Sequence, residues 1–269
     1  MTDAPLISSR QNPRIVAARQ LNERKYRQQQ GQFLVEGVKL LEMALRAGAQ
    51  PRTAFVCTEQ LTPEAAALLE PLRAARAELL AVTPAVLAAL AERTATQGLL
   101  VTFDLFETTL ERWQPASTGL VLVLDRLQDP GNLGTLLRTA DAVGAAGVAL
   151  LEPCVDPFDP KTVRGSMGSL FHLPLIRTAD APALFHRLRG HGYSVVAADA
   201  HRGVDWGDGL WRGGVALVLG NEARGLSPDV APQVDAWARL PIAGAAESLN
   251  VAVAGGVLMY SWLRATTAA

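Results

Sequence analysis

Continuous apolar runs in the second half of the chain most constrain what it can fold into. Four such runs lie at 120–124, 148–151, 195–198 and 215–219, and a shorter one lies at 238–242. A strand that is buried on both faces has this pattern, and parallel sheets bury both faces of their strands. Stretches with helical spacing separate or follow these runs, at 133–143, 161–170, 181–189 and 250–264. We therefore expect a parallel α/β sheet with helices on both faces.

The first half of the chain has shorter signals. Strands are expected at 33–35, 53–57, 79–82 and 99–103, and helices at 13–30, 38–47 and 83–92. This alternation predicts a separate small α/β domain, which we assign to residues 1–105. Residues 106–118 have no clean period and contain Pro115, so we expect a linker there and a second domain over residues 119–269.

The composition narrows the class of protein. Hydrophobic residues make up 49% of the 269 residues and charged residues 19%, so the chain can bury a core and is not disordered as a whole. Cys57 and Cys154 are its only cysteines, which excludes a disulfide framework and fits a reducing compartment. The four histidines have no paired spacing, and we expect no metal site. The first residues lack the apolar core of a signal peptide, and no apolar stretch is long enough for a bilayer, so we expect a cytoplasmic protein without membrane insertion.

Positive charge is concentrated at the start of the chain, although the whole chain has a formal net charge of −1. Residues 1–52 hold nine basic and four acidic side chains. This pattern fits either a solvated helix face or a surface that binds RNA phosphates, because Lys and Arg gain affinity by releasing counterions from nucleic acid. For the second alternative, the candidate RNA-binding residues are Arg10, Arg14, Arg24, Lys25 and Arg27.

Three polar stretches of the second domain lie where open parallel sheets bind ligands, after the carboxyl ends of strands. They are 125–138, 220–227 and 240–250. Each also has a purely structural interpretation. Asn132 can cap the helix that follows it, and Arg138 can be a surface charge or the partner of an internal ion pair. Residues 220–227 can be a plain loop with turn glycines, and Ser248 or Asn250 can cap the last helix.

Taken together, the three stretches resemble the three motifs of the SpoU (TrmH) family of RNA ribose 2′-O-methyltransferases in the SPOUT superfamily. The matching segments are DPGNLGTLLRTADAVGA at 129–145, LVLGNEARGLS at 217–227 and LPIAGAAESLNVAVAGGVLMY at 240–260. The segment at 164–174 is similar to the region between the family's first two motifs, and the resemblance covers about residues 119–265. NPRI at 12–15 and FLVEGVKLLEMAL at 33–45 are similar to the small substrate-binding domain of many members, which resembles ribosomal protein L30e.

The resemblance implies a SPOUT-type parallel sheet with a C-terminal trefoil knot, preceded by an L30e-like α/β domain. It implies a homodimer whose interface includes the last helix. It also implies S-adenosylmethionine as the cofactor. The cofactor-binding residues that it implies are Ala198, Gly220, Leu240, Ile242 and Leu249. The residues that it assigns to substrate and catalysis are Asn132, Arg138, Glu222, Ser248 and Asn250.

The activity that the resemblance implies is methylation of a ribose 2′-hydroxyl. The L30e-like start favours 23S ribosomal RNA as the substrate, because that domain suits a folded RNA, and this step is an analogy. Two alternatives stay open. One is a tRNA ribose 2′-O-methyltransferase, and the other is a non-catalytic RNA-binding or ribosome-assembly factor with the same fold.

Methyl transfer to a ribose is an in-line displacement that needs alignment and removal of the hydroxyl proton. The family resemblance gives the role of base to Arg138, but a guanidinium is a poor base, because it stays protonated at any ordinary pH. Our hypothesis is that Arg138 binds the neighbouring RNA phosphate and stabilises the developing alkoxide, with that phosphate as one destination for the hydroxyl proton. Asn132, Ser248 and Asn250 would then orient the ribose and the helix ends. Glu222 would orient Arg138 or an amide.

Overall fold

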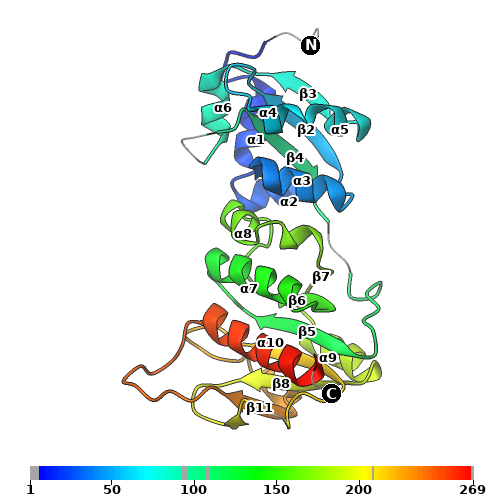
Figure 1. Cartoon of the computed structure of the whole chain (residues 1–269), viewed down its shortest axis with the longest axis vertical. Coiled ribbons are helices and arrows are strands. Elements are labelled where there is room, and N and C mark those ends of the chain that lie inside the picture. The colour runs from blue at the N-terminus through cyan, green and yellow to red at the C-terminus, as the bar shows by residue number, and fades with distance from the viewer. Residues whose placement is uncertain (1–5, 93–95, 107–108, 208, 268–269) are drawn as a thin grey trace. The chain divides into compact units, whose positions relative to one another are not determined.

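The computed structural model describes residues 6–92, 96–106, 109–207 and 209–267 (Figure 1). The chain divides into two compact units. The first unit contains the chain up to Phe106 together with Asp156–Phe171, and the second contains Glu107–Val155 and His172–Ala269. A segment that the sequence analysis assigned to the second domain therefore belongs to the first unit. The expected linker at 106–118 includes residues 107 and 108, which lie outside the described residues.

The first unit contains a four-stranded sheet in the order β1-β4-β2-β3, in which β2 and β3 are parallel and the other pairs antiparallel. Its strands are β1 (Gln32–Glu36), β2 (Pro51–Val56), β3 (Glu78–Ala81) and β4 (Leu99–Asp104). The helices between and before them are α1 (Pro13–Gln20), α2 (Arg24–Gln30), α3 (Val38–Arg46), α4 (Pro63–Ala66), α5 (Leu69–Ala74) and α6 (Pro84–Leu90). All four predicted strands are present, whereas α4 and α5 do not appear in the sequence-based expectation.

The single helix predicted over 13–30 is two helices, and a buried arginine explains the break. α1 ends at Gln20, and α2 begins at Arg24. Between them, Arg27 Nη1 donates to the backbone carbonyls of Leu21 and Asn22 at 2.7 and 3.0 Å. Carbonyls at a helix end have no helical N–H partner and need another donor. The chain can therefore turn here without leaving these acceptors unsatisfied.

Arg27 also anchors the inserted segment of the first unit. Its Nε donates to Asp156 Oδ2 at 2.8 Å, and its Nη2 lies 3.9 Å from Asp159 Oδ2. The residue is only 2% exposed. Arg27 is one of the candidate RNA-binding residues predicted from the sequence. This assignment is wrong, because a buried guanidinium that is already paired cannot reach an RNA phosphate.

The inserted segment, Asp156–Phe171, extends the core of the first unit with aromatic side chains. It contains α8 (Pro160–Gly165) and a 3-10 turn, η1 (Ser169–Phe171). Phe158 and Phe171 pack on Phe33, with ring centroids 4.9 and 6.1 Å from that of Phe33. The continuous helix predicted over 161–170 ends at Gly165 instead, and the chain then turns through Met167, with a φ of +51°, and Gly168, with a φ of +97°. A Cβ there would also collide with the side chain of Met43, so the position requires glycine.

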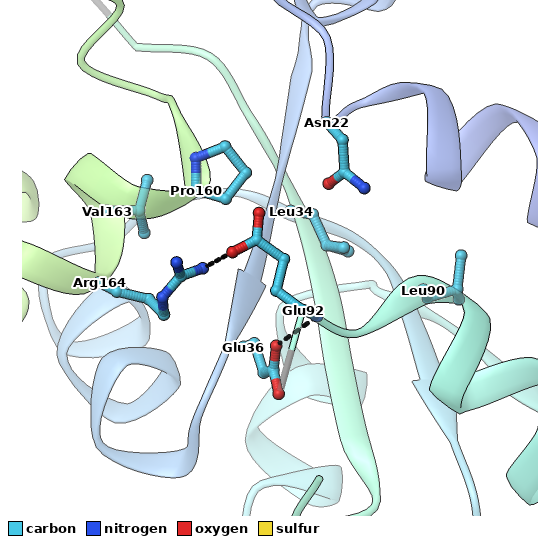
Figure 2. A pocket seen from close by; sticks show the side chains of 8 residues that line it. All are labelled: Asn22, Leu34, Glu36, Leu90, Glu92, Pro160, Val163 and Arg164. Carbon is cyan, nitrogen blue, oxygen red and sulfur yellow. Dashed lines mark hydrogen bonds and ion pairs between the residues drawn. The ribbon is translucent and has the colours of Figure 1, made fainter. Parts of the chain in front are cut away.

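Charged side chains also hold α8 in the first unit (Figure 2). Arg164 forms an ion pair with Glu92, and the Glu92 backbone N–H donates to Glu36 Oε2 at 3.2 Å. Together with Leu34 and Val163, these residues line a hollow of about 10 Å³. A hollow of that size has room for about one water molecule, so we assign no ligand to it.

The second unit contains a seven-stranded sheet in which all neighbouring strands are parallel. The strand order is β7-β6-β5-β10-β8-β11-β9. The strands are β5 (Gly119–Asp125), β6 (Gly147–Leu151), β7 (Leu175–Thr178), β8 (Tyr193–Ala198), β9 (Val204–Asp205), β10 (Gly214–Leu219) and β11 (Ala236–Arg239). The helices are α7 (Pro130–Ala142), α9 (Ala181–Gly190) and α10 (Val251–Thr267), with a 3-10 turn η2 (Ala231–Gln233). The predicted parallel α/β sheet is confirmed, although the strand expected at 238–242 begins earlier and β7 and β9 were not expected.

Helices cover both faces of this sheet. Alternate residues of a strand point to opposite faces, so neighbouring strand residues show which helix lies on which face. Val121 and Val123 of β5 share a buried cluster with Phe185 of α9. On the other face, a Cβ on Gly255 of α10 would lie 2.6 Å from Leu219 Cδ1 of β10. Glycine therefore lets α10 lie close against the sheet. Of the helices that the structure describes, none is both long and apolar enough to cross a membrane.

Replacing Arg27 with Met should lower the free energy of unfolding by about 3–5 kcal/mol, because Asp156 then stays buried without its charged partner. The measurement is denaturant-induced unfolding followed by circular dichroism. Arg14→Met is the matched control, since Arg14 forms an exposed ion pair with Glu78 and such pairs contribute about 0–1 kcal/mol. Equal destabilisation by the two substitutions would contradict the structural role of Arg27.

Candidate active site

Three segments that are far apart in the chain meet at one edge of the parallel sheet. β5 and β10 are neighbouring strands, and Leu124 pairs with Leu219 at their carboxyl ends. The turn after β5 leads into α7, and the loop after β10 carries Glu222. α7 and α10 pack against each other on one face of the sheet (Figure 1). The starts of these two helices and the loop after β10 therefore come together.

A chain of side-chain hydrogen bonds joins the three segments. Asn250 Nδ2 donates to Asn132 Oδ1 at 3.0 Å, and Asn132 Nδ2 donates to Glu222 Oε1 at 3.0 Å. We call Asn250, Asn132 and Glu222 the relay. Each of them comes from a different one of the three polar stretches, and all three are among the residues that the sequence analysis assigned to substrate and catalysis.

The start of α10 fixes the direction of the relay. Asn250 Oδ1 accepts from the backbone N–H groups of Ala252 and Val253 at 2.9 and 3.3 Å, which confirms that Asn250 caps the last helix. Only an oxygen can accept these bonds, so Nδ2 of Asn250 must face Asn132. Oδ1 of Asn132 then faces Asn250, and Nδ2 of Asn132 faces Glu222. The backbone of α10 thus determines which atom of each amide points to its neighbour.

The cap of α7 is Asp129 rather than Asn132. Asp129 Oδ1 accepts from the Asn132 backbone N–H at 2.7 Å, and Pro130 occupies the first helical position. The interpretation of Asn132 as a cap is wrong, because Asn132 lies inside the first turn of α7. Its side chain takes part in the relay instead.

Asn221 holds the turn that carries Glu222. Its backbone pairs with that of Gly225 in both directions, at 3.0 and 2.9 Å. Its Oδ1 accepts from two backbone N–H groups of the same turn, and its Nδ2 donates to the Arg126 carbonyl at 2.9 Å. Asn221 is not among the site residues predicted from the sequence. The available signal was an asparagine beside turn glycines, because asparagine readily bonds the backbone of its own turn.

The ends of β5 and β10 are tied closely together. The carboxylate of Asp125, at the end of β5, is 1% exposed and accepts from the Ser227 backbone N–H at 2.5 Å. At the start of the same loop, a Cβ on Gly220 would lie 2.7 Å from the carbonyl carbon of Gly225. A side chain at this position would therefore force the turn open.

Arg138 and Ser248 lie outside the relay. Arg138 is exposed on α7, at about 9 Å along the helix axis from Asn132. Ser248 is exposed in the loop before α10. Neither side chain forms a hydrogen bond or an ion pair with a residue in the described part of the chain. Of the residues assigned to catalysis, the structure brings together the three of the relay.

A hollow of about 680 Å³ lies beside the loop that leads to the relay. Leu240 and Ile242, two of the predicted cofactor-binding residues, line it. The other lining residues are Ala200, His201, Asp205, Arg239, Pro241, Ala246 and Glu247. The remaining predicted cofactor-binding residues, Ala198, Gly220 and Leu249, are not part of its lining. The volume and the mixed apolar and charged walls suit a nucleoside-sized ligand.

Asp199 orders the loop at the rim of this hollow. Its carboxylate accepts from the backbone N–H groups of His201 and Arg202 at 2.8 and 3.1 Å and from Arg202 Nε at 2.9 Å. Burial raises the pKa of Asp199, but these hydrogen bonds outweigh burial, so the pKa lies below its ordinary value. The Arg202 guanidinium also lies 3.7 Å from the centroid of the Trp237 ring. The rim is therefore held against β11.

Two family models match the chain. The model described as the SpoU rRNA Methylase family matches residues 119–260. The model described as the MRM3-like substrate binding domain matches residues 12–101. The first match includes all three motifs, and the second includes the two N-terminal segments that resemble a substrate-binding domain.

Similar proteins and structures extend over nearly the whole chain. An uncharacterised tRNA/rRNA methyltransferase of Synechocystis sp. is 36% identical over 100% of this chain and 97% of its own. The 23S rRNA (guanosine(2553)-2′-O)-methyltransferase of Bacillus subtilis is 32% identical over 94% of this chain and 97% of its own. The crystal structure of an AdoMet-bound rRNA methyltransferase from Sinorhizobium meliloti has a TM-score of 0.89 at 33% identity and covers 98% of each chain.

These matches confirm the resemblance that the three motifs indicated, and they confirm an N-terminal substrate-binding domain ahead of the parallel sheet. The matched range 119–260 includes the whole relay and the lining of the hollow. The chain belongs to the SpoU rRNA methylase family.

Proposed function

We propose that this protein transfers a methyl group from S-adenosylmethionine to a ribose 2′-hydroxyl of 23S ribosomal RNA. The observation that carries the proposal is the relay, which joins one polar side chain from each family motif. The choice of RNA is supported by the Bacillus subtilis relative, which is named a 23S rRNA 2′-O-methyltransferase. A tRNA ribose methyltransferase is the second candidate, because the Synechocystis relative is named a tRNA/rRNA methyltransferase.

The residues around the hollow fit the proposed cofactor. S-adenosylmethionine supplies a methyl group on a positively charged sulfur. Leu240 and Ile242 offer apolar walls for an adenosine group, and Glu247 offers a carboxylate to a positively charged group. We assign Ala198, Gly220 and Leu249 to the same site on the strength of the family resemblance.

Arg138 is proposed to bind the RNA phosphate next to the target ribose. Its guanidinium has no partner among the described residues, so a ligand can pair with it. A guanidinium stays protonated and can bind phosphate oxygens with two N–H groups at once. Its charge would also stabilise negative charge that develops on the 2′-oxygen. Ser248 is proposed to orient the ribose from the loop before α10.

The proposal includes a homodimer formed through α10. Val253 and Tyr260 lie seven residues apart on α10, so they share one face of the helix. Their exposed fractions are 54% and 53%. Exposed apolar side chains gathered on one face are typical of a contact surface. A second copy of the chain is the partner that the family resemblance implies.

We also propose the C-terminal trefoil knot for the segment between β11 and α10. Residues 240–250 run from the hollow to the relay, and they bring α10 back to a helix that follows β5. The knot would form if the C-terminal end of the chain passes through the loop that this returning segment closes.

Because the proposed substrate is ribosomal RNA, we place the protein in the cytoplasm.

The first unit is proposed to hold the RNA through its N-terminal basic residues. Arg10 and Lys25 are exposed, and Arg14 forms an exposed ion pair with Glu78. Exposed ion pairs are weak, so a phosphate can displace the carboxylate. Arg24, beside Lys25 at the start of α2, completes the proposed surface.

Purified protein should transfer a labelled methyl group from S-adenosylmethionine to 23S rRNA from cells that lack this protein. Nuclease digestion and mass spectrometry of the product should then identify a 2′-O-methylated nucleotide. The control is 23S rRNA from cells that contain the protein, which should accept no further methyl group. Transfer to tRNA alone would support the second candidate, and RNA binding without any transfer would contradict an enzyme.

Replacing Arg138 with Lys should lower kcat/KM for RNA by about 100-fold, because an ammonium group cannot bind a phosphate with two N–H groups of fixed geometry. Affinity for S-adenosylmethionine, measured by equilibrium dialysis, should not change. Arg112→Lys, another exposed arginine of the second unit, is the control. Full activity of the Arg138→Lys protein with normal cofactor affinity would rule out the bidentate phosphate role.

Replacing Arg10 and Lys25 together with Ala should weaken RNA binding and reduce its salt dependence. The slope of log K against log salt should fall by about 1.4–1.8, or about 0.7–0.9 for each of the two phosphates that the protein no longer binds. Substitutions are preferable to deleting residues 1–105, because the deletion would strip Phe158 and Phe171 of their packing partner. The control removes the same charge elsewhere, by replacing Arg73 and Arg76 with Ala. An equal slope change in both proteins would contradict the proposed location.

A further inference from the structure

We propose that Glu222 accepts the proton of the 2′-hydroxyl group and that the relay positions its carboxylate for this role. The inference rests on the proposed function and assigns one step of that reaction to a named atom, Glu222 Oε2. Arg138 keeps its separate role at the phosphate.

The two oxygens of the Glu222 carboxylate have different surroundings. Oε1 accepts from Asn132 Nδ2 at 3.0 Å. Oε2 forms no hydrogen bond or ion pair with the residues that the structure describes, and Glu222 is exposed. One oxygen is therefore fixed by the protein, and the other is open to a substrate hydroxyl. A carboxylate held in this way can point a lone pair at a group that donates a proton.

The direction of the relay makes Glu222 an acceptor. Backbone N–H groups of α10 donate to Asn250, Asn250 donates to Asn132, and Asn132 donates to Glu222. A proton on Oε1 would face the N–H of Asn132 and would break the last bond. Hydrogen bonds in such a chain polarise one another, and the N-terminal end of a helix carries partial positive charge. The relay therefore connects the positive end of α10 to the negative carboxylate.

No charged neighbour competes with the relay for this carboxylate. Besides Glu222, the charged residues on the segments that meet here are Asp125, Arg126, Asp129, Arg138, Arg224 and Glu247. Asp125 and Arg126 pair with each other, and Asp129 caps α7. Glu247 lines the hollow. Within the described part of the chain, none of these groups forms an ion pair with Glu222.

The chemistry requires a modest proton acceptor rather than a strong base. In the proposed step, a bond forms between the 2′-oxygen and the methyl carbon while the carbon–sulfur bond breaks, and its electron pair stays on sulfur. The hydroxyl proton passes to Glu222 Oε2 and then to water. An oxygen that is gaining a methyl group becomes a much stronger acid than the free hydroxyl, so a carboxylate can take its proton. A guanidinium cannot, because it has no free lone pair to accept one.

Glu222→Gln tests the acceptor directly. A glutamine keeps an oxygen for Asn132 but accepts no proton, so kcat should fall by about 100-fold or more while KM for RNA changes little. Affinity for S-adenosylmethionine, measured by equilibrium dialysis, should not change. Asp229→Asn, an exposed carboxylate further along the same loop, is the control and should keep wild-type kcat. Wild-type kcat in the Glu222→Gln protein would overturn the proposal.

Asn250→Asp separates the cap of α10 from the relay. Aspartate caps helices about as well as asparagine, so the midpoint of thermal unfolding should stay near that of the wild type. It has no Nδ2 to donate to Asn132, so kcat should fall by about tenfold or more. Asn250→Ala, which removes both functions, should lower the unfolding midpoint as well. Full kcat in the Asn250→Asp protein would overturn the role of the relay.

Asn132→Asp tests whether the reaction needs Glu222 ionised. Two carboxylates about 3 Å apart share one proton. When the pH is lowered, the Asn132→Asp protein should therefore lose kcat at a higher pH than the wild type does. A loss of kcat that is the same at every pH would indicate a merely structural role for the relay and would overturn the proposal.

A second readout needs neither cofactor nor RNA. In the cofactor-free protein, the carbon-13 signal of the Glu222 carboxyl group should change with pH over a higher range in Asn132→Asp than in the wild type, because the second carboxylate disfavours a negative charge on Glu222. An unchanged midpoint would overturn the relay. A wild-type protein that transfers no methyl group would instead contradict the proposed function, and the titration would still report on the relay.

Discussion

The hydrogen bonds at the start of α10 are the constraint on which the site depends. The first N–H groups of a helix have no helical acceptor, and Asn250 Oδ1 supplies one at 2.9 and 3.3 Å. Because this oxygen is occupied, Asn250 can present only its Nδ2 to Asn132. The same bonds that begin the helix therefore decide that Glu222, at the far end of the relay, receives a hydrogen bond and does not donate one.

The parallel sheet makes this contact possible between segments that are far apart in the chain. Asn132 and Glu222 are separated by 90 positions, and Asn132 and Asn250 by 118. Since β5 and β10 are neighbours in the sheet, their carboxyl ends place the two following loops side by side. Gly255 lets α10 approach the sheet closely, and Asn221 fixes the turn that carries Glu222. A glycine in α10 and an asparagine in one turn thus help to position the relay, whose residues are far apart in the sequence.

Much of the fold and part of the site follow from the sequence, for identifiable reasons. The apolar runs of β5 and β10 predict buried parallel strands, because a strand that is buried on both faces carries apolar side chains at successive positions. The three motifs predicted the relay residues, although not their contacts. Arg27 could not be judged from sequence, because its burial depends on Asp156, which lies 129 positions away. The cap of α7 was misassigned because Asp129 and Asn132 both suit an N-cap, and only the structure shows which side chain turns back to the helix.

Neutron diffraction from crystals of the protein exchanged into heavy water would test the central claim most directly, because it locates hydrogen isotopes. The account predicts two deuterium atoms on the Asn132 nitrogen, one of them directed at Glu222 Oε1, and two on the Asn250 nitrogen, one of them directed at Asn132. It predicts no deuterium on either Glu222 oxygen at neutral pH. A reversed Asn132 amide, or a deuterium on Glu222 directed at Asn132, would contradict the direction of the relay and the role of Glu222 as an acceptor.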